Sequence, residues 1–313
     1  MVTNLSGTVQ RIALTGATGF VGRAVLETAA AAGLSVRALA RRVPDGAPPA
    51  GVEFVRGDLA DRMALAELTH NAEAVIHVAG LTRTPHPQEF ETVNVLGTQT
   101  LIEAARARNV QRFVLVSSLA AREPQLSAYG ASKARAETLV RSSSFDWTIV
   151  RPPAVYGPQD TEMFELFRSA AKLGIVPLPP RGRTSLIHVD DLARLLVALA
   201  ASGEAGEVLE PDDGQPGGYS HAQLAQMIGR AVGRERVLAP HLPAAVLRVA
   251  AQGDRLVRGK KAKFTPDRAS YMSHPDWVVA PDARPPAQLW QPAISAQDGL
   301  AQTAAWYRTK GWL

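Results

Sequence analysis

The chain has 313 residues, of which 46% are hydrophobic and 20% are charged, and its formal net charge is +5. This composition suits a globular protein, and because there is no cysteine, disulfides, thiolate metal sites and cysteine nucleophiles are excluded; we expect no bound metal. The basic residues are dispersed without an accompanying array of aromatic residues, so we expect no nucleic-acid partner. The sequence shows no apolar run long enough to span a membrane and no signal-peptide pattern, which favours a cytoplasmic location.

The first 150 residues alternate between short apolar runs and stretches of helical periodicity. We expect strands at 11–15, 34–39, 52–55, 74–79, 112–117 and 145–150, and helices at 20–32, 61–69 and 88–108. Because such an alternation places a helix between successive parallel strands, it predicts an α/β fold built on a Rossmann-type, doubly wound parallel sheet.

Beyond Tyr156-Gly157-Pro158 the pattern is less regular. We expect helices at 162–173, 192–200 and 221–232, followed by loops rich in proline and tryptophan. The strongly apolar segment 192–200 is expected to return to the first domain, so the two lobes are interleaved. The predicted NADP-binding domain comprises 1–157 and 184–203, and a smaller substrate-binding lobe comprises 158–183 and 204–313.

Three glycines follow the first strand in Gly16-Ala17-Thr18-Gly19-Phe20-Val21-Gly22, and a helix follows them. Glycine lets a phosphate approach the backbone closely, and the N-H groups and dipole at the start of the helix favour a pyrophosphate. The spacing differs by one residue from the common dinucleotide pattern, and tight glycine turns also occur without a ligand. We expect a nucleotide cofactor here, bound by Gly16, Thr18, Gly19, Phe20, Val21 and Gly22.

The second strand ends at Ala40-Arg41-Arg42. A carboxylate at this turn would bind the ribose 2'-hydroxyl of NAD(H), whereas basic residues would bind the 2'-phosphate of NADP(H). Arg41 and Arg42 offer bidentate contacts to a phosphate, so NADP(H) is the preferred cofactor and NAD(H) the alternative. A solvated arginine pair is the competing interpretation.

Two later turns are expected to complete the cofactor site. Asp58 and Leu59 follow the third strand, where Asp58 would accept a hydrogen bond from the adenine amine or cap the helix that begins near Asp61. Ala79 and Gly80 end the fourth strand, where small side chains would let the cofactor ribose approach closely.

Tyr129 and Lys133 are four residues apart, so on a helix they share one face. A free phenol has a pKa of about 10, and a nearby ammonium favours the phenolate. We therefore expect Lys133 to lower the pKa of Tyr129, so that the phenol can exchange a proton with a substrate oxygen. A solvated helix face without function is the alternative.

Taken in order, the motifs resemble the extended short-chain dehydrogenase/reductase family, which includes nucleotide-sugar epimerases and dehydratases, dihydroflavonol reductases and 3β-hydroxysteroid dehydrogenases. The resemblance rests on Thr15 to Gly22, His77-Val78-Ala79-Gly80, Val93 to Thr98, Ser117-Ser118, Tyr129-x-x-x-Lys133, Arg151-Pro152-Pro153 through Tyr156-Gly157-Pro158, and His188-Val189-Asp190-Asp191. It implies that Tyr129 is the catalytic acid/base, that Lys133 also holds the nicotinamide ribose and that Ser118 hydrogen-bonds the reacting oxygen. It further implies a cofactor contact at Pro152 and a homodimer through helices that flank the active-site face.

Within that family, the residues favour a ketone reductase. Dehydratases usually follow the active-site serine or threonine with Asp-Glu, whereas this chain has Ser118-Leu119-Ala120. Epimerases usually carry an asparagine after the arginine of the sixth strand and an arginine before Ile-His-Val. Here Pro152 and Thr184 occupy those positions, although Arg181 and Arg183 lie nearby. The expected substrate contacts are Thr82, Asn94, Pro153, Ala154 and Val155.

Residues 244–263 form a basic amphipathic pattern, in which Val246, Val249 and Leu256 alternate with arginine and lysine. Such a helix can lie on anionic lipid, here at the inner face of the membrane, or can pack on the protein surface. The first case would make a lipid ketone the natural substrate.

The leading hypothesis is an NADP(H)-dependent oxidoreductase that interconverts a ketone and a secondary alcohol on an apolar, lipid-like small molecule. A nucleotide-sugar 4-epimerase that uses the same tyrosine is the first alternative. A non-catalytic nucleotide-binding subunit, resembling the accessory subunit of respiratory complex I, is the second.

Overall fold

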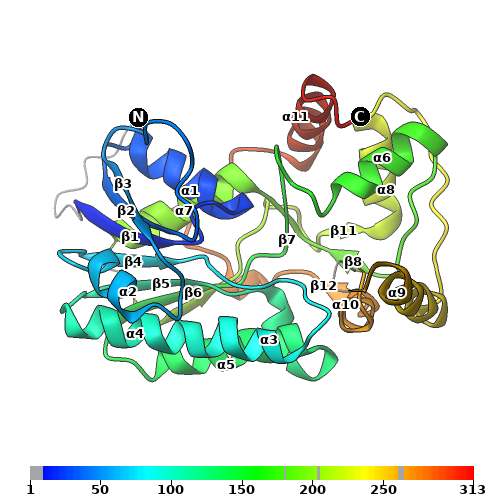
Figure 1. The fold of residues 1–313 in the computed structure, drawn as a ribbon. Coiled ribbons are helices and arrows are strands. Elements are labelled where there is room, and N and C mark those ends of the chain that lie inside the picture. The colour runs from blue at the N-terminus through cyan, green and yellow to red at the C-terminus, as the bar shows by residue number, and fades with distance from the viewer. Residues whose placement is uncertain (1–9, 180, 203–204, 260–263) are drawn as a thin grey trace.

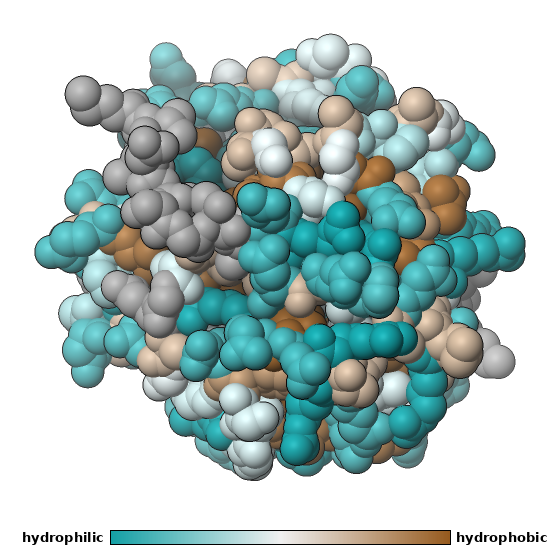
Figure 2. Space-filling view, turned by 90° about the vertical axis from the view of Figure 1, so that its left-hand side faces the viewer, coloured by the Kyte–Doolittle hydropathy of each residue, from teal (hydrophilic) through white to brown (hydrophobic). Residues whose placement is uncertain are grey.

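The computed structural model describes residues 10–179, 181–202, 205–259 and 264–313. Its main feature is a parallel sheet of seven strands in the order β10-β6-β5-β4-β1-β2-β3 (Figure 1). The strands are β1 (Arg11–Thr15), β2 (Ser35–Ala40), β3 (Val52–Arg56), β4 (Ala74–His77), β5 (Arg112–Val116), β6 (Asp146–Val150) and β10 (Glu207–Leu209). The strand order reverses next to β1, which confirms the predicted doubly wound sheet. The surface at the left of Figure 1 carries mainly hydrophilic side chains with apolar ones between them (Figure 2).

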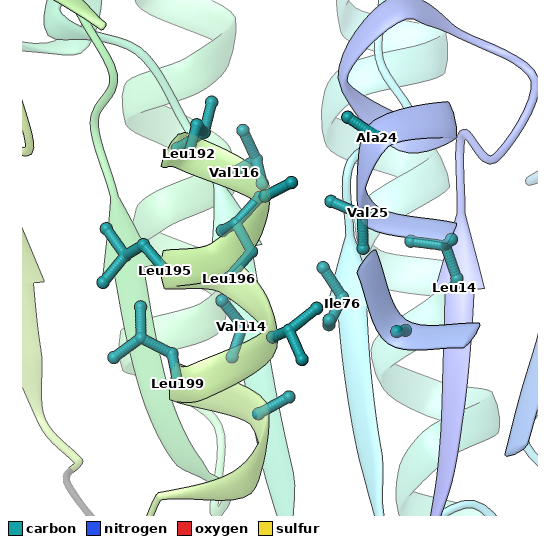
Figure 3. Close-up of a cluster of buried hydrophobic side chains, with 14 of the residues drawn as sticks. Leu14, Ala24, Val25, Ile76, Val114, Val116, Leu192, Leu195, Leu196 and Leu199 are labelled. Carbon is teal, nitrogen blue, oxygen red and sulfur yellow. The ribbon is translucent and has the colours of Figure 1, made fainter. Parts of the chain in front are cut away.

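Helices cover both faces of this sheet. One face carries α1 (Phe20–Ala31) and α7 (Val189–Ala201), and the other carries α2 (Arg62–Leu68), α4 (Gly97–Ala107) and α5 (Ala128–Arg141) (Figure 1). On the first face, Leu196 of α7 and Val25 of α1 belong to one buried cluster with Val114 and Ile76 of the sheet (Figure 3). Strands buried on both faces need apolar residues at successive positions, which explains why they read as continuous apolar runs in the sequence.

The second lobe has a hydrophobic core of its own. The helices α6 (Phe164–Leu173), α8 (His221–Ala231) and α11 (Ala296–Thr309) bury Phe167, Ile228 and Tyr307 there. Two small sheets border the lobe: β7 (Ala154–Tyr156) beside β9 (Leu186–His188), and β8 (Arg183–Thr184) between β11 (Tyr219–Ser220) and β12 (Asp276–Trp277). The helices α9 (Ala244–Arg258) and α10 (Pro266–Met272) pack on each other, and the short helical turns are η2 (Leu119–Arg122), η3 (Pro124–Leu126) and η5 (Pro281–Ala283).

The predicted domain boundary after residue 203 is wrong. Strand β10 lies in the segment assigned to the substrate lobe, yet Val208 pairs with Ile149 of β6 in the main sheet. The first domain therefore reaches Leu209. A strand of three residues is too short for a periodicity signal, so the sequence pattern could not mark it.

Two helical regions also differ from the prediction. The predicted helix at 88–108 consists of α3 (Gln88–Phe90), a π-helical turn η1 (Glu91–Leu96) and α4. Such turns occur frequently at functional sites, and this one carries Asn94. In addition, α10 and α11 lie where loops were predicted, because each packs against neighbours that only the folded lobe provides.

Candidate active site

The glycine loop joins β1 to α1 and lies against the end of β4. Gly16 has a φ of +75°, and a Cβ at this residue would lie 2.7 Å from the backbone nitrogen of Ala79. A Cβ on Gly22 would lie 2.0 Å from the carbonyl oxygen of Gly16. Glycine is thus required at both positions, and the loop leads its backbone into the N-terminus of α1, as a bound pyrophosphate would need.

The remaining predicted loop residues divide into exposed and packed ones. Thr18 and Gly19 are exposed, whereas Phe20 and Val21 are half-buried and pack against the core beneath. Arg23 braces the loop, because its Nε donates to the carbonyl oxygen of Thr18 at 2.9 Å. The exposed backbone at Thr18 and Gly19 is therefore the part of the loop that a ligand can reach.

The turns after β2 and β3 place the other predicted cofactor residues. Arg41 and Arg42 follow β2 directly and are both exposed. Asp58 is exposed as well, and the cap of α2 is Asp61, whose Oδ1 accepts from the backbone nitrogens of Met63 and Ala64. Asp58 is therefore not the helix cap, but its Oδ1 accepts from the backbone nitrogen of Ala60 at 2.9 Å and so stabilises the turn after β3; the adenine contact stays a prediction.

Leu59 and the end of β4 complete the predicted cofactor contacts. The side chain of Leu59 is buried, and a Cβ on Gly97 would lie 2.8 Å from it, so this side chain belongs to the core. Ala79 donates its backbone N-H to the hydroxyl of Thr15 at 3.2 Å, which ties the end of β4 to β1. Gly80 is exposed beside them.

The structure brings Ser118, Tyr129 and Lys133 together. Tyr129 and Lys133 lie on α5, which Ser127 caps by accepting from the backbone nitrogen of Gly130 at 2.9 Å. Ser118 follows β5, and its side chain interacts with the phenol of Tyr129. The buried Nζ of Lys133 donates to the carbonyl oxygen of Val116 at 2.7 Å.

The phenol of Tyr129 does not titrate as predicted. Burial raises the pKa of Tyr129 to about 12; the hydroxyl of Ser118 acts in the opposite direction, and Tyr271 and Glu162 raise the pKa further. Burial also lowers the pKa of Lys133 to about 8. Because the ammonium is bound to Val116 and the phenol is desolvated, the prediction that Lys133 lowers the pKa of Tyr129 is wrong. The phenol is protonated at neutral pH, which is the form that donates a proton.

A buried ionic network lies behind the two serines. Ser117 donates to Glu137 at 2.6 Å, and Arg151 donates to both carboxylate oxygens of Glu137 at 2.8 and 2.7 Å. Arg151 also lies 3.5 Å from Glu210, at the end of β10. The hydroxyl of Ser117 is committed to this network, which leaves Ser118 facing the phenol. Sequence reasoning missed Glu137, although a carboxylate one helical turn after a lysine was an available signal.

Asn94 positions the loop that follows β4. Its Oδ1 accepts from the backbone nitrogen of Leu81 at 2.7 Å, and its Nδ2 donates to the carbonyl oxygen of Leu81 at 3.0 Å and to Ser132 at 2.9 Å. Both amide hydrogens are used within the protein, so these contacts are those of a positioning residue. Thr82, in the same loop, is exposed.

The segment after β6 presents the predicted apolar contacts. Pro152 is buried, Pro153 and Val155 are half-buried, and Ala154 is exposed. Arg183, which could substitute for the arginine of an epimerase, donates to the carbonyl oxygens of Gly217 and Gly218 at 2.6 and 2.9 Å. Its guanidinium thus stabilises a turn of the second lobe.

Helix α10 brings residues to the site that sequence reasoning missed. The carboxylate of Asp267 accepts from the backbone nitrogens of Ala128 and Tyr129 at 2.6 and 3.4 Å. The ring of Tyr271 lies 6.0 Å from the ring of Tyr129, and the ring of Phe90 lies 5.8 Å from it. Ala128 and Asp267 are 139 positions apart, and no short motif marks the helix, so only folding reveals the contact.

Comparison with known proteins places this site in a family. The sequence model of the NAD-dependent epimerase/dehydratase family matches residues 12–210, which include the glycine loop, Tyr129 and Lys133. A ceramide reductase of Caulobacter vibrioides (strain NA1000 / CB15N) is 38% identical over 318 aligned positions, which cover 100% of this chain and 98% of the relative. A 4-hydroxy-2-methyl-3-oxo-4-farnesyl-3,4-dihydroquinoline-1-oxide ketoreductase of Stigmatella aurantiaca is 33% identical and covers 66% of this chain and 69% of its own.

Solved structures share the fold. The crystal structure of gox2253 superposes with a TM-score of 0.77 at 24% identity, covering 97% of this chain and 99% of the other. MoeE5 in complex with UDP-glucose and NAD superposes with a TM-score of 0.71 at 24% identity, covering 96% and 99%. At these identities the likeness establishes the architecture.

Proposed function

The chain belongs to the NAD-dependent epimerase/dehydratase family, and we propose that within this family it interconverts a ketone and a secondary alcohol on an apolar, lipid-like substrate with NADP(H). Membership makes it an NAD(P)-dependent oxidoreductase of the extended short-chain dehydrogenase/reductase type. When bound, the nicotinamide cofactor supplies or takes up the hydride. The glycine loop fits its pyrophosphate, because only glycine at positions 16 and 22 lets the backbone turn tightly into the N-terminus of α1; a Cβ at either would clash with the backbone of Ala79 or Gly16.

Tyr129 carries out the proposed proton transfer. Since burial raises its pKa to about 12, the phenol stays protonated at neutral pH and donates its proton to the carbonyl oxygen as the alcohol forms. Ser118, beside the phenol, donates a hydrogen bond to the same oxygen and stabilises the charge that grows on it.

The aromatic surroundings of Tyr129 are the observation that carries the preference for an apolar substrate. The rings of Phe90 and Tyr271 lie within 6.0 Å of its own ring. Aromatic walls favour apolar groups, whereas the diphosphate of a nucleotide sugar needs available cations, and Arg183 is engaged elsewhere.

The similarity to a ceramide reductase supports a particular lipid class. We propose a ceramide-like substrate, an N-acylated long-chain amino alcohol whose secondary alcohol has been oxidised to the ketone. Such a molecule combines long apolar chains with an uncharged polar end. The apolar chains suit the aromatic rings beside Tyr129. The uncharged polar end needs no cation, which agrees with the engagement of Arg183 elsewhere.

A substrate panel tests the reaction. Purified protein with NADPH should oxidise the cofactor in the presence of the keto form of ceramide, with a secondary alcohol identified by mass spectrometry. Steroid ketones, flavonoid ketones and UDP-sugars serve as comparison substrates. Inversion of a UDP-sugar without net NADPH oxidation would reject the reductase and support the 4-epimerase, the second candidate, because the matching family includes epimerases.

The cofactor preference rests on Arg41 and Arg42. Replacing both by alanine should weaken NADPH binding by about tenfold or more, because hydrogen bonds between charged groups contribute about 1.5–3 kcal/mol each. The affinity for NADH should be unchanged, since NADH lacks the 2'-phosphate. Fluorescence titration of both cofactors measures the difference, and equal losses for both would contradict the assignment. The matched control is Arg106→Ala with Arg108→Ala, because both arginines are exposed at the C-terminal end of α4.

We also propose that α9 contacts anionic membrane, as the amphipathic pattern predicts. Val246, Val249 and Leu256 are exposed on it, while Lys260, Lys261 and Lys263 lie outside the described residues. Among the helices of the described segments, none is both long and apolar enough to traverse a bilayer, so the proposed contact is peripheral.

Vesicle sedimentation tests the membrane contact. The protein should sediment with phosphatidylglycerol vesicles more than with phosphatidylcholine vesicles, and Val249→Asp with Leu256→Asp should abolish this difference. Met63→Asp, at an exposed apolar position of α2, is the control. Equal sedimentation with both lipids would reject the contact. A location at the inner face of the membrane stays a prediction. A homodimer also stays a prediction, and the mass of the protein in solution would test it.

A further inference from the structure

Helix α10 covers the catalytic helix from the second lobe. Asp267 binds the first backbone N-H groups of α5, and four residues later Tyr271 places its ring 6.0 Å from that of Tyr129. Two points of α10, one turn apart, thus hold it against α5. A substrate whose ketone reaches Tyr129 therefore also meets Tyr271.

Beside the two phenols, one carboxylate holds two arginines from different segments. Glu162, just before α6, accepts from Arg83 of the loop after β4 at 2.5 Å and forms an ion pair with Arg268 of α10. Its charge acts on the phenols of both Tyr129 and Tyr271. The cluster consequently lies at the reacting tyrosine, although its members come from three separate parts of the chain.

The carboxylates of this cluster outnumber its cations. The guanidinium groups of Arg83 and Arg268 both pair with Glu162. The carboxylate of Asp267 also acts on Tyr271, and the buried Asp160 lies close enough to act on Arg268. Asp160 already accepts from the backbone nitrogens of Glu162 and Met163. With three carboxylates against two guanidinium groups, the cluster has no excess positive charge to attract a phosphate.

The paired arginines still have hydrogen-bonding capacity. A guanidinium has five N-H donors, of which a bond to one carboxylate oxygen uses one, and a protonated phenol both donates and accepts. Burial raises the pKa of Tyr271, so its phenol keeps its proton at neutral pH. Such a set recognises an uncharged polar group, because a hydroxyl or an amide can satisfy donors and acceptors together.

We propose that Tyr271, together with Glu162, Arg83 and Arg268, forms a polar subsite that hydrogen-bonds an uncharged hydroxyl or amide group of the substrate next to the ketone. This inference rests on the proposed function for the identity of the substrate. It assigns the polar end of the lipid to the side of α10, and it makes Tyr271 a residue that determines specificity.

Equilibrium binding tests the subsite without requiring turnover. The probes are a short-chain ceramide and its analogue in which hydrogen replaces the primary hydroxyl, each titrated calorimetrically into NADPH-loaded protein. Wild-type protein should bind the hydroxylated probe about tenfold more tightly, the magnitude expected for one buried hydrogen bond in a site with charged partners. Tyr271→Phe, which keeps the ring, should bring the two affinities close together. Glu162→Gln should reduce the preference as well, because it releases both arginines.

Tyr219→Phe is the matched control, since the hydroxyl of Tyr219 is held by Asp213 at 2.7 Å in β11, and it should keep the wild-type preference. Equal wild-type affinities, no binding of either probe, or an unchanged preference in Tyr271→Phe would each overturn the subsite. Protein that binds selectively but reduces no keto-lipid would keep the subsite and reject the proposed reaction, so the two failures are distinguishable.

Discussion

Replacing Tyr129 by phenylalanine is expected to lower kcat for ketone reduction by about 10²- to 10⁴-fold, the range that a positioned general acid contributes. The substitution removes the proton donor and keeps the ring between Phe90 and Tyr271. Binding of NADPH should be unchanged, because the glycine loop at Gly16 and Gly22 is not altered. Steady-state NADPH oxidation and fluorescence titration of NADPH measure the two quantities on the same protein.

Tyr219→Phe, which removes a phenol hydroxyl from β11 in the second lobe, should keep wild-type turnover and is the control for a general effect of losing a hydroxyl. If Tyr129→Phe kept its turnover, another group would be the acid, and the assigned role of the phenol would be wrong. If turnover were lost while the cellular role of the protein persisted, the non-catalytic nucleotide-binding subunit would become the better interpretation.

The second large effect is expected at Gly22. Alanine there would place its Cβ 2.0 Å from the carbonyl oxygen of Gly16, so the loop or the first turn of α1 must move. Overpacking of this kind costs about 1–3 kcal/mol, which corresponds to a loss of about 10- to 100-fold in NADPH affinity if the displaced backbone is the binding surface. Titration of NADPH fluorescence gives the affinity, and circular dichroism shows whether the fold is kept.

Gly253→Ala provides the comparison for this substitution. Gly253 lies within helix α9, and an added Cβ there would have no heavy atom within 4 Å. Its NADPH affinity should match that of the wild type. Should Gly22→Ala bind NADPH as tightly as Gly253→Ala does, the cofactor would have to lie elsewhere than on the glycine loop.

The first half of the fold was predictable because its signals are local. Six apolar runs predicted six of the seven strands, and the glycine spacing predicted a loop where Gly16 indeed needs a positive φ. Spacing also predicted that Tyr129 and Lys133 share a helix, since residues four apart always face the same side. Strand β10 was missed because Glu207–Leu209 is too short to show a period.

The titration of the site was predicted wrongly for a physical reason. Sequence spacing places Lys133 near Tyr129, but it carries no information on desolvation, which depends on every group packed around the phenol. Burial raises the pKa of Tyr129 instead, and Tyr271 and Glu162, which come from other parts of the chain, raise it further. The amide group of Asn94 donates to Leu81 and Ser132, and no sequence motif indicates these contacts.

The amino-acid sequence alone was thus sufficient to predict the parallel sheet, the glycine loop and the shared helix face of Tyr129 and Lys133. Each of these features depends on the periodicity and steric limits of a few neighbouring residues. The protonated state of the phenol and the wall formed by α10 arise from contacts such as that between Ala128 and Asp267, 139 positions apart. Such contacts, and the loss of water that accompanies them, exist only once the two lobes have packed together.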